Sequence, residues 1–163
     1  KRVLEQLSTE HPNLRLEMAG ADSYARGLGY IRSWFERQLG PMRKYIHFLG
    51  VLGAAELDEA YRRAWVVLVP SRWDTFPQVV LEAMVRSKAI VASPFGGMPE
   101  MLVETSCVVA DPATNVFAET VAGLLANPVR RQQAGVSACR RAATAYSPEH
   151  VAEKYIEFIS AQL

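Results

Sequence analysis

The stretch WVVLVPSRWDTFPQVVLEAM, residues 65–84, decides how this chain folds. Its first six residues form an unbroken apolar run that ends at Pro70. Such a run predicts a strand covered on both faces, as in parallel sheets, so we expect Val67 and Leu68 to be almost fully buried. The residues from Pro77 onward have the apolar spacing and the first-turn proline that are typical of a helix. The stretch therefore predicts a buried strand, a polar loop and a helix in succession.

The same alternation extends in both directions along the chain. Helices are predicted for residues 3–10, 29–39, 55–64, 77–87 and 99–104, and strands for residues 14–20, 45–50, 65–70, 89–93 and 107–110. Asn127-Pro128 and Tyr146-Ser147-Pro148 divide the helical tail into three helices. Alternating strands and helices with short connections predict an α/β fold, a doubly wound parallel sheet with helices on both faces.

Composition excludes several classes of protein and site. The 163 residues suit about one domain. Eighteen basic and seventeen acidic residues leave a formal charge of +1, which gives no support for a nucleic-acid partner. Cys107 and Cys139 match no metal or redox spacing, and the apolar run CVVA around Cys107 predicts a buried free thiol. No apolar run reaches the ~18 residues of a membrane span, and no signal peptide opens the chain. These features predict a cytoplasmic location.

Two acidic residues, Asp74 and Glu82, follow the predicted strand 65–70. In open parallel sheets, ligands bind beyond the carboxyl ends of the strands, which is where Asp74 falls. Free N–H groups at the start of the next helix suit a phosphate, and Glu82, one to two turns further on, can accept hydrogen bonds from vicinal hydroxyls. The alternative is structural: Asp74 or Thr75 caps the helix, and Glu82 is an ordinary helix residue.

Residues 66–102 resemble the family-4 retaining glycosyltransferases of the GT-B architecture, which has two Rossmann domains. The signature of that family is an acid, seven residues and Glu-Ala-Met, followed by a strand that ends near Gly-Gly-x-x-Glu. Its counterparts here are Asp74, Glu82-Ala83-Met84 and Gly96-Gly97-Met98-Pro99-Glu100. The resemblance extends through LRLEMAG, HFLGVL and the helical tail. It implies that residues 1–163 are the Rossmann-like C-terminal, donor-binding domain, a fragment of a longer chain.

The resemblance also implies a role for each site residue. Asp74 would be the catalytic residue that contacts the transferred sugar, and Glu82 would bind the ribose hydroxyls of the donor. The other donor-binding positions are Thr75, Phe76 and Pro77 around the sugar, the backbone of Gln78 and Val79 at the diphosphate, Val51 and Leu52 at the base, and Gly20 near the phosphates. For Gly20, and equally for Gly96 and Gly97, a plain turn without donor contact remains the alternative.

Three departures from the family pattern stand out. Asp74 occupies a position where the family usually has Glu, so its carboxylate is one methylene shorter. Ser87 and Ala89 stand where Gly and Pro are common, with expected effects on structure only. The family's diphosphate-binding Arg and Lys, and the first strand of its 3-2-1-4-5-6 sheet, precede residue 1. We therefore expect the sheet of this chain to lack its first strand.

The resemblance implies the donor-binding half of a retaining glycosyltransferase of the hexosyltransferase type. The complete enzyme would transfer a sugar from a nucleotide diphosphate sugar to an unknown acceptor, with no cofactor and no metal ion. Its N-terminal domain would be a partner within the same chain, and any peripheral membrane contact would come through that missing half. The fragment alone is expected to be inactive. Two alternatives stay open: a non-catalytic nucleotide-sugar-binding module, and a doubly wound interaction domain in which Asp74 only caps a helix.

Overall fold

The computed structural model describes residues 1–162. The chain folds into two compact units, Lys1–Arg63 and Ala64–Leu163. The first unit contains α1 (Arg2–Leu7), β1 (Leu16–Ala19), β2 (Tyr24–Ala25), β3 (Gly29–Tyr30), α2 (Ile31–Leu39), the 3-10 helix η1 (Gly40–Tyr45), β4 (Ile46–Gly50) and α3 (Ala54–Arg63). The second contains β5 (Val66–Val69), α4 (Gln78–Val85), β6 (Ala89–Ala92), α5 (Met98–Leu102), β7 (Val108–Val109), α6 (Asn115–Ala126), α7 (Pro128–Ala145) and α8 (Pro148–Ser160).

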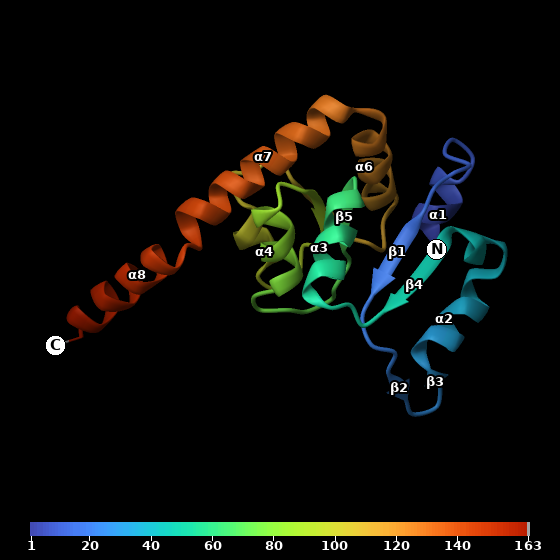
Figure 1. The fold of residues 1–163 in the computed structure, drawn as a ribbon, viewed down its shortest axis with the longest axis horizontal. Helices are drawn as coiled ribbons and strands as arrows, with labels where there is room; N and C mark the ends of the chain where they lie inside the picture. The colour runs from blue at the N-terminus through green and yellow to red at the C-terminus, as the bar shows by residue number, and fades with distance from the viewer. Residues whose placement is uncertain (163) are drawn as a thin grey trace. The chain divides into compact units, whose positions relative to one another are not determined.

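In the first unit, β1 and β4 run parallel and lie side by side (Figure 1). The pairing begins at Leu16 with Ile46 and shifts register between Met18 and Ala19. Leu4, Leu39, Tyr45 and Ile46 form a buried cluster beneath the two strands. The burial of residues from α1, α2, η1 and β4 in one cluster explains why these short elements form together.

A short hairpin made of β2 and β3 follows β1 and was not predicted. Its strands have two residues each, too few to show the alternation by which a sequence indicates a strand. The predicted helix 29–39 consequently begins two residues later, at Ile31. The backbone amide of Arg32 donates to Asp22 Oδ1 at 2.9 Å, so a carboxylate ten residues upstream holds the start of α2.

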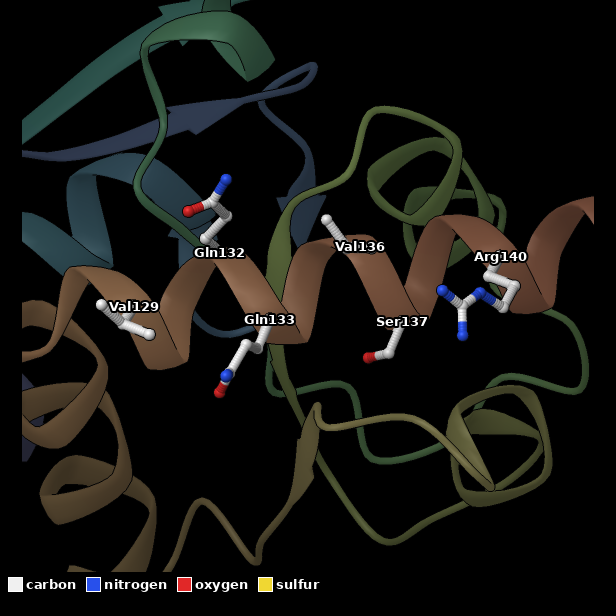
Figure 2. A pocket seen from close by; sticks show the side chains of 6 residues that line it. All are labelled: Val129, Gln132, Gln133, Val136, Ser137 and Arg140. Carbon is white, nitrogen blue, oxygen red and sulfur yellow. The ribbon is translucent and has the colours of Figure 1, made fainter.

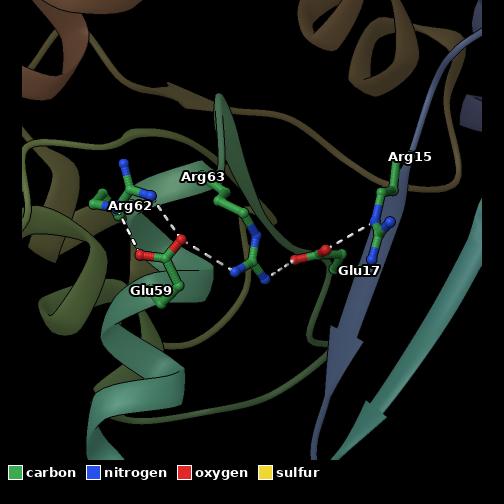
Figure 3. Close-up of polar contacts among 5 residues, drawn as sticks. All are labelled: Arg15, Glu17, Glu59, Arg62 and Arg63. Atoms are coloured by element: carbon green, nitrogen blue, oxygen red, sulfur yellow. Dashed lines mark hydrogen bonds and ion pairs between the residues drawn. The ribbon is translucent and has the colours of Figure 1, made fainter.

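A chain of alternating charges connects α3 to β1 (Figure 3). Glu59 lies between Arg62 and Arg63, with an Arg62 Nε–Glu59 Oε2 distance of 2.6 Å. Arg63 then reaches Glu17 at 3.2 Å, and Arg15 lies 2.8 Å from the other oxygen of Glu17. The hydrogen bond from Arg62 lowers the pKa of Glu59 below its usual value. Exposed pairs of this kind are screened by solvent and contribute little to stability, so the network mainly orients α3.

In the second unit, β5, β6 and β7 form a parallel sheet in that order. All four residues of β6 are buried, and because side chains alternate along a strand, both faces of β6 are covered. Helices α4, α6 and α7 contact this strand. The parallel strands and their helices agree with the predicted α/β class.

Two residues of β5, Val67 and Leu68, are less buried than predicted. Val67 and Leu68 are half-buried, and only Val69 of this strand is buried. The reason lies in the strand order, because β5 is hydrogen-bonded to β6 on one side and lies at the end of the described three-stranded sheet. Whether a further strand precedes residue 1 stays a prediction.

The three predicted tail helices are confirmed, with their boundaries at the two proline sites. The Asn127 side chain accepts a hydrogen bond from the Arg130 amide and caps α7, and the Ser147 side chain accepts from the His150 amide and caps α8. These are the residue types that most favour helix N-caps, and each precedes a proline in the first turn.

Helix α4 ends in a Schellman motif whose left-handed residue is Ser87. The amide of Ser87 donates to Met84 O and that of Lys88 to Ala83 O, both at 3.0 Å, which is the hydrogen-bond pair of this motif. The φ of Ser87 is +54°, a conformation that glycine adopts with little strain. A Cβ on Gly135 of α7 would collide with the carbonyl oxygen of Ser87. A glycine at position 87, which is common in the family that the sequence resembles, would thus have a local structural reason.

The loops that follow β5 and β6 touch backbone to backbone at Gly96 and Gly97. A Cβ on Gly96 would collide with the carbonyl of Asp74, and a Cβ on Gly97 with that of Thr75. The amide of Gly97 donates to Asp74 O at 2.8 Å. These two glycines therefore have a packing role, and the first loop could not lie as close to the second if either carried a side chain.

We expect Ser87→Gly to raise the free energy of unfolding by about 0.5–1 kcal/mol. The substitution removes the strain of a left-handed residue with a Cβ, and the added flexibility of the unfolded chain offsets part of the gain. Urea denaturation measures the change. Ser87→Ala is the matched control, because it removes the hydroxyl but keeps the strain. Equal stability of the glycine and alanine variants would refute the explanation.

Gly97→Ala should lower the free energy of unfolding by about 1–3 kcal/mol, the usual cost of overpacking. The φ of Gly97 is −80°, which alanine tolerates, so the effect is purely steric. The matched control is Gly123→Ala inside α6, where the nearest atom to an added Cβ is the mobile Arg130 Nη1 at 3.4 Å. That control should gain up to about 1 kcal/mol. Similar behaviour of both variants in thermal or urea denaturation would contradict the tight contact.

Candidate functional site

The candidate site in the second unit consists of two loops at the carboxyl ends of β5 and β6. Ser93 follows β6 and is fully buried. Its amide donates to Val69 O at 3.0 Å, and its hydroxyl donates to Ser71 O. One buried serine thus fixes the chain at the point where it leaves β5, ahead of Asp74.

Asp74 is half-buried, and its carboxylate is used locally. Its Oδ1 atom accepts a hydrogen bond from the backbone amide of Phe76 at 3.1 Å, an Asx-turn arrangement. The N-cap residue of α4 is Pro77, whose side chain makes no capping hydrogen bond, so neither Asp74 nor Thr75 occupies the N-cap position itself. Asp74 therefore shapes the loop before the helix.

The start of α4 is open to solvent on one side. Pro77 is buried, whereas Thr75, Phe76, Gln78 and Val79 are exposed. The first backbone N–H groups of a helix have no partner within the helix and carry a partial positive charge. Gln78 and Val79 occupy this first turn, as predicted.

Glu82 lies one turn further along α4 and is half-buried. Its neighbours Val80, Ala83 and Met84 are buried, so Glu82 lies on the less covered side of a helix whose other side packs in the core. Its own backbone carbonyl accepts a hydrogen bond from Arg86 Nη1 at 3.0 Å. A carboxylate in this position keeps access to solvent, while the opposite side of the helix packs in the core.

In the first unit, the structure brings together the carboxyl ends of β1 and β4. The amide of Gly20 donates to Gly50 O at 2.8 Å. Gly20 has a φ of +139° and is exposed, with no atom within 4 Å of a Cβ built on it. Val51 is exposed and Leu52 is half-buried directly after β4. The residues predicted to meet the phosphates and the base in this unit are thus neighbours.

Two further residues lie next to the second-unit site: Arg141 within α7 and Tyr146 at the C-terminal end of that helix. The sequence did not predict either of them. The Tyr146 ring lies 5.5 Å from the Phe76 ring at an interplanar angle of 70°. Arg141 lies 5.8 Å from the Tyr146 ring centroid and donates to the carbonyls of Glu100 and Met101 at the end of α5. Neither residue belongs to a local pattern, so only the tertiary structure identifies them.

A separate hollow of about 390 Å³ lies along one side of α7 (Figure 2). Its lining residues all come from this helix, and none is a predicted site residue: Val129, Gln132, Gln133, Val136, Ser137 and Arg140. The Ser137 hydroxyl is already engaged, since it accepts from the Ser106 amide at 2.8 Å. The hollow therefore adds nothing to the site at the strand ends.

The described residues also bear on three further properties: metal binding, membrane spanning and cysteine reactivity. Within residues 1–162, no three His, Cys, Asp or Glu side chains are placed to hold a metal ion together, and no helix has both the length and the apolarity of a membrane span. Cys107 and Cys139 are free cysteines, and both are half-buried, so the predicted full burial of Cys107 is wrong in degree. Burial raises the pKa of the Cys107 thiol, which disfavours the reactive thiolate.

Known proteins of similar sequence and structure were compared with this chain. D-inositol 3-phosphate glycosyltransferase from Corynebacterium diphtheriae is 32% identical over 146 residues, which is 87% of this chain and 34% of that protein. Sucrose-phosphate synthase from Thermosynechococcus elongatus has a TM-score of 0.79 at 23% identity, covering 98% of this chain and 42% of that one. Anabaena HepE in complex with UDP-glucose has a TM-score of 0.80 at 17% identity, covering 98% and 44%.

The chain spans only about a quarter to a third of the length of the curated relatives that it matches. The similar structures show the fold, a Rossmann-like domain, which confirms the predicted fold class. The sequence matches the family described as Glycosyl transferases group 1 over residues 1–127. On this match, and with this fold, the chain belongs to the group 1 glycosyl transferases and has the architecture of a GT-B C-terminal domain.

Proposed function

We propose that this chain binds the nucleotide diphosphate sugar in a retaining glycosyltransferase of the hexosyltransferase type. The observation that carries the proposal is the loop Asp74–Pro77, held at the carboxyl end of β5 and leading into the solvent-exposed first turn of α4. The family match supports transferase activity, and HepE, a protein of the same fold, is described in complex with UDP-glucose. A complete enzyme would include an N-terminal domain, and residues 1–163 would form its donor-binding domain, inactive by itself.

Each residue of the second unit has a role in this proposal. Glu82 accepts hydrogen bonds from the ribose hydroxyls, for which its rigid and partly open position on α4 is suited. The backbone of Gln78 and Val79 meets the diphosphate at the positive end of the helix. Asp74 contacts the transferred sugar, and Thr75, Phe76 and Pro77 surround that sugar.

In the first unit, the backbone after β4 is proposed to hold the base at Val51 and Leu52. Gly20 allows the phosphates to approach the chain, because no side chain occupies the space beside its Cα. Backbone amides and helix ends can stabilise a leaving diphosphate, so the reaction proposed here involves no metal ion. The acceptor is a second substrate of the complete enzyme, which would act in the cytoplasm, and any contact with a membrane surface belongs to its other half.

The direct test is a binding screen with UDP, GDP and ADP and the corresponding nucleotide hexoses. Chemical-shift changes in the protein, followed by NMR up to millimolar ligand, detect even weak binding. Shifts at Val51, Gln78 and Glu82 with one of the three nucleotides would support the proposal. The absence of shifts at these residues with all six ligands would refute the donor-binding role.

Glu82→Ala should weaken the nucleoside diphosphate and the sugar donor equally, by about 10- to 100-fold, because hydrogen bonds to a charged acceptor contribute about 1.5–3 kcal/mol. Asp74→Ala should weaken mainly the sugar donor. Glu119→Ala in α6, an exposed carboxylate of the same unit, is the matched control and should change neither affinity.

Asp74→Asn separates the two functions of Asp74, because an amide oxygen can keep the hydrogen bond from Phe76 while the charge is lost. If the charge contacts the sugar, Asp74→Asn weakens the sugar donor as much as Asp74→Ala does. Calorimetric titration of each variant with both ligands gives these ratios. Unchanged nucleoside diphosphate affinity in Glu82→Ala would show that the ribose assignment is wrong.

A further inference from the structure

The end of α7 contacts the candidate sugar loop through a pair of aromatic rings. Tyr146 is the C-cap residue of α7, held by a hydrogen bond from its amide to Ala142 O at 3.0 Å. Its ring meets that of Phe76 edge to face, with centroids 5.5 Å apart. Tyr146 is half-buried, whereas Phe76 is 41% exposed. The tyrosine thus supports the phenylalanine from the protein side and leaves part of it open to solvent.

Tyr146 is itself fixed by Arg141, which lies one turn earlier on α7. The Arg141 guanidinium lies 5.8 Å from the Tyr146 ring centroid. Its Nε and Nη2 atoms donate to Met101 O and Glu100 O, both at 2.9 Å. Last-turn carbonyls of a helix lack partners within the helix, so a cation there is well placed. Arg141 therefore ties the end of α7 to the end of α5.

The contacts of Arg141 and Tyr146 reach Asp74 from two sides, through α5 and through Phe76. Helix α5 begins directly after Gly97, whose amide donates to Asp74 O at 2.8 Å. On the other side, the Phe76 amide donates to Asp74 Oδ1 at 3.1 Å. The Gly97 amide, next to α5, thus holds the carbonyl oxygen of Asp74, and the Phe76 amide holds its carboxylate. Displacement of Phe76 would release the carboxylate without touching the carbonyl contact.

We propose that Tyr146 is a positioning residue for the sugar part of the donor, because it holds Phe76 and, through the Phe76 amide, the carboxylate of Asp74. The inference rests on the proposed function and adds to it a residue far from the signature segment. The ring of Tyr146 meets Phe76 of the sugar loop and lies beside Arg141, so its effect should be confined to the sugar and spare the nucleotide.

The test compares Tyr146→Ala with Tyr146→Phe and with Tyr155→Ala. Tyr146→Phe keeps the ring and should retain wild-type behaviour. Tyr155 lies on α8 and is 66% exposed, so Tyr155→Ala is a matched control for loss of a tyrosine ring. The ligands are the nucleoside diphosphate and the nucleotide hexose that bind in the screen described above, measured by calorimetry.

In Tyr146→Ala, we expect the affinity for the nucleotide hexose to fall by roughly 2- to 10-fold, the range that corresponds to losing an edge-to-face aromatic pair. The affinity for the nucleoside diphosphate should stay unchanged. A purely structural role for Tyr146 predicts equal losses for both ligands together with a lower melting temperature. Equal losses, or no loss in either ligand, would overturn the inference.

Amide hydrogen exchange provides a second readout that needs no ligand. Loss of the Tyr146 ring should speed exchange at the Phe76 amide, which donates to Asp74 Oδ1, more than at the Gly97 amide, which donates to Asp74 O. Tyr146→Phe and Tyr155→Ala should leave both rates unchanged. If wild-type protein binds none of the nucleotides, the proposed function fails, while the exchange rates still decide whether Tyr146 positions the loop. Unchanged exchange at Phe76 in Tyr146→Ala would refute that positioning.

Discussion

The second unit depends on strand β6 and on the serine that follows it. β6 is hydrogen-bonded on both sides and covered on both faces, so its position is set by the whole core of that unit. Ser93 transmits this position outward, because its amide and hydroxyl bind the carbonyls of Val69 and Ser71 on the neighbouring chain segment. The loop that carries Asp74 is thus anchored to the most buried strand by one small polar side chain whose own burial is made tolerable by its hydrogen bonds.

The features that sequence predicts well here are those set by local pattern. The apolar run 65–70, Pro77 and the two proline breaks in the tail each indicated an element or a boundary that the structure contains, although Pro77 is the N-cap of α4 and not part of its first turn. The general rule for parallel sheets, that ligands bind beyond the carboxyl ends of the strands, also allowed the position of Asp74 to be predicted from the sequence. The resemblance of Glu82-Ala83-Met84 and Gly96-Gly97 to a known signature then gave the family, which the comparisons confirm.

The features that sequence could not predict arise from contacts between distant segments. Nothing near Phe76 indicates that Tyr146 will pack against it, and nothing near Arg32 indicates a cap from Asp22. The half-burial of Val67 and Leu68 depends on how many neighbours β5 has, which an apolar run alone does not reveal. The left-handed backbone at Ser87 was likewise hidden, because serine at that position gives no sign of the turn that glycine would have indicated.

The contact at Gly96 and Gly97 has a consequence for which positions of the loop before α4 can vary. It joins backbone to backbone, so the side chains of Asp74, Thr75 and Phe76 take no part in the collision that the glycines avoid. Asp74 and Phe76 also hold the loop through the Asx-turn hydrogen bond and the Tyr146 contact, whereas Thr75 is exposed, so a substitution at Thr75 can alter the surface of the loop while the backbone contact is preserved. Under the proposed function, the preference for one donor sugar could thus change through an exposed side chain of the loop, without any change in the glycine contact or in the core beneath it.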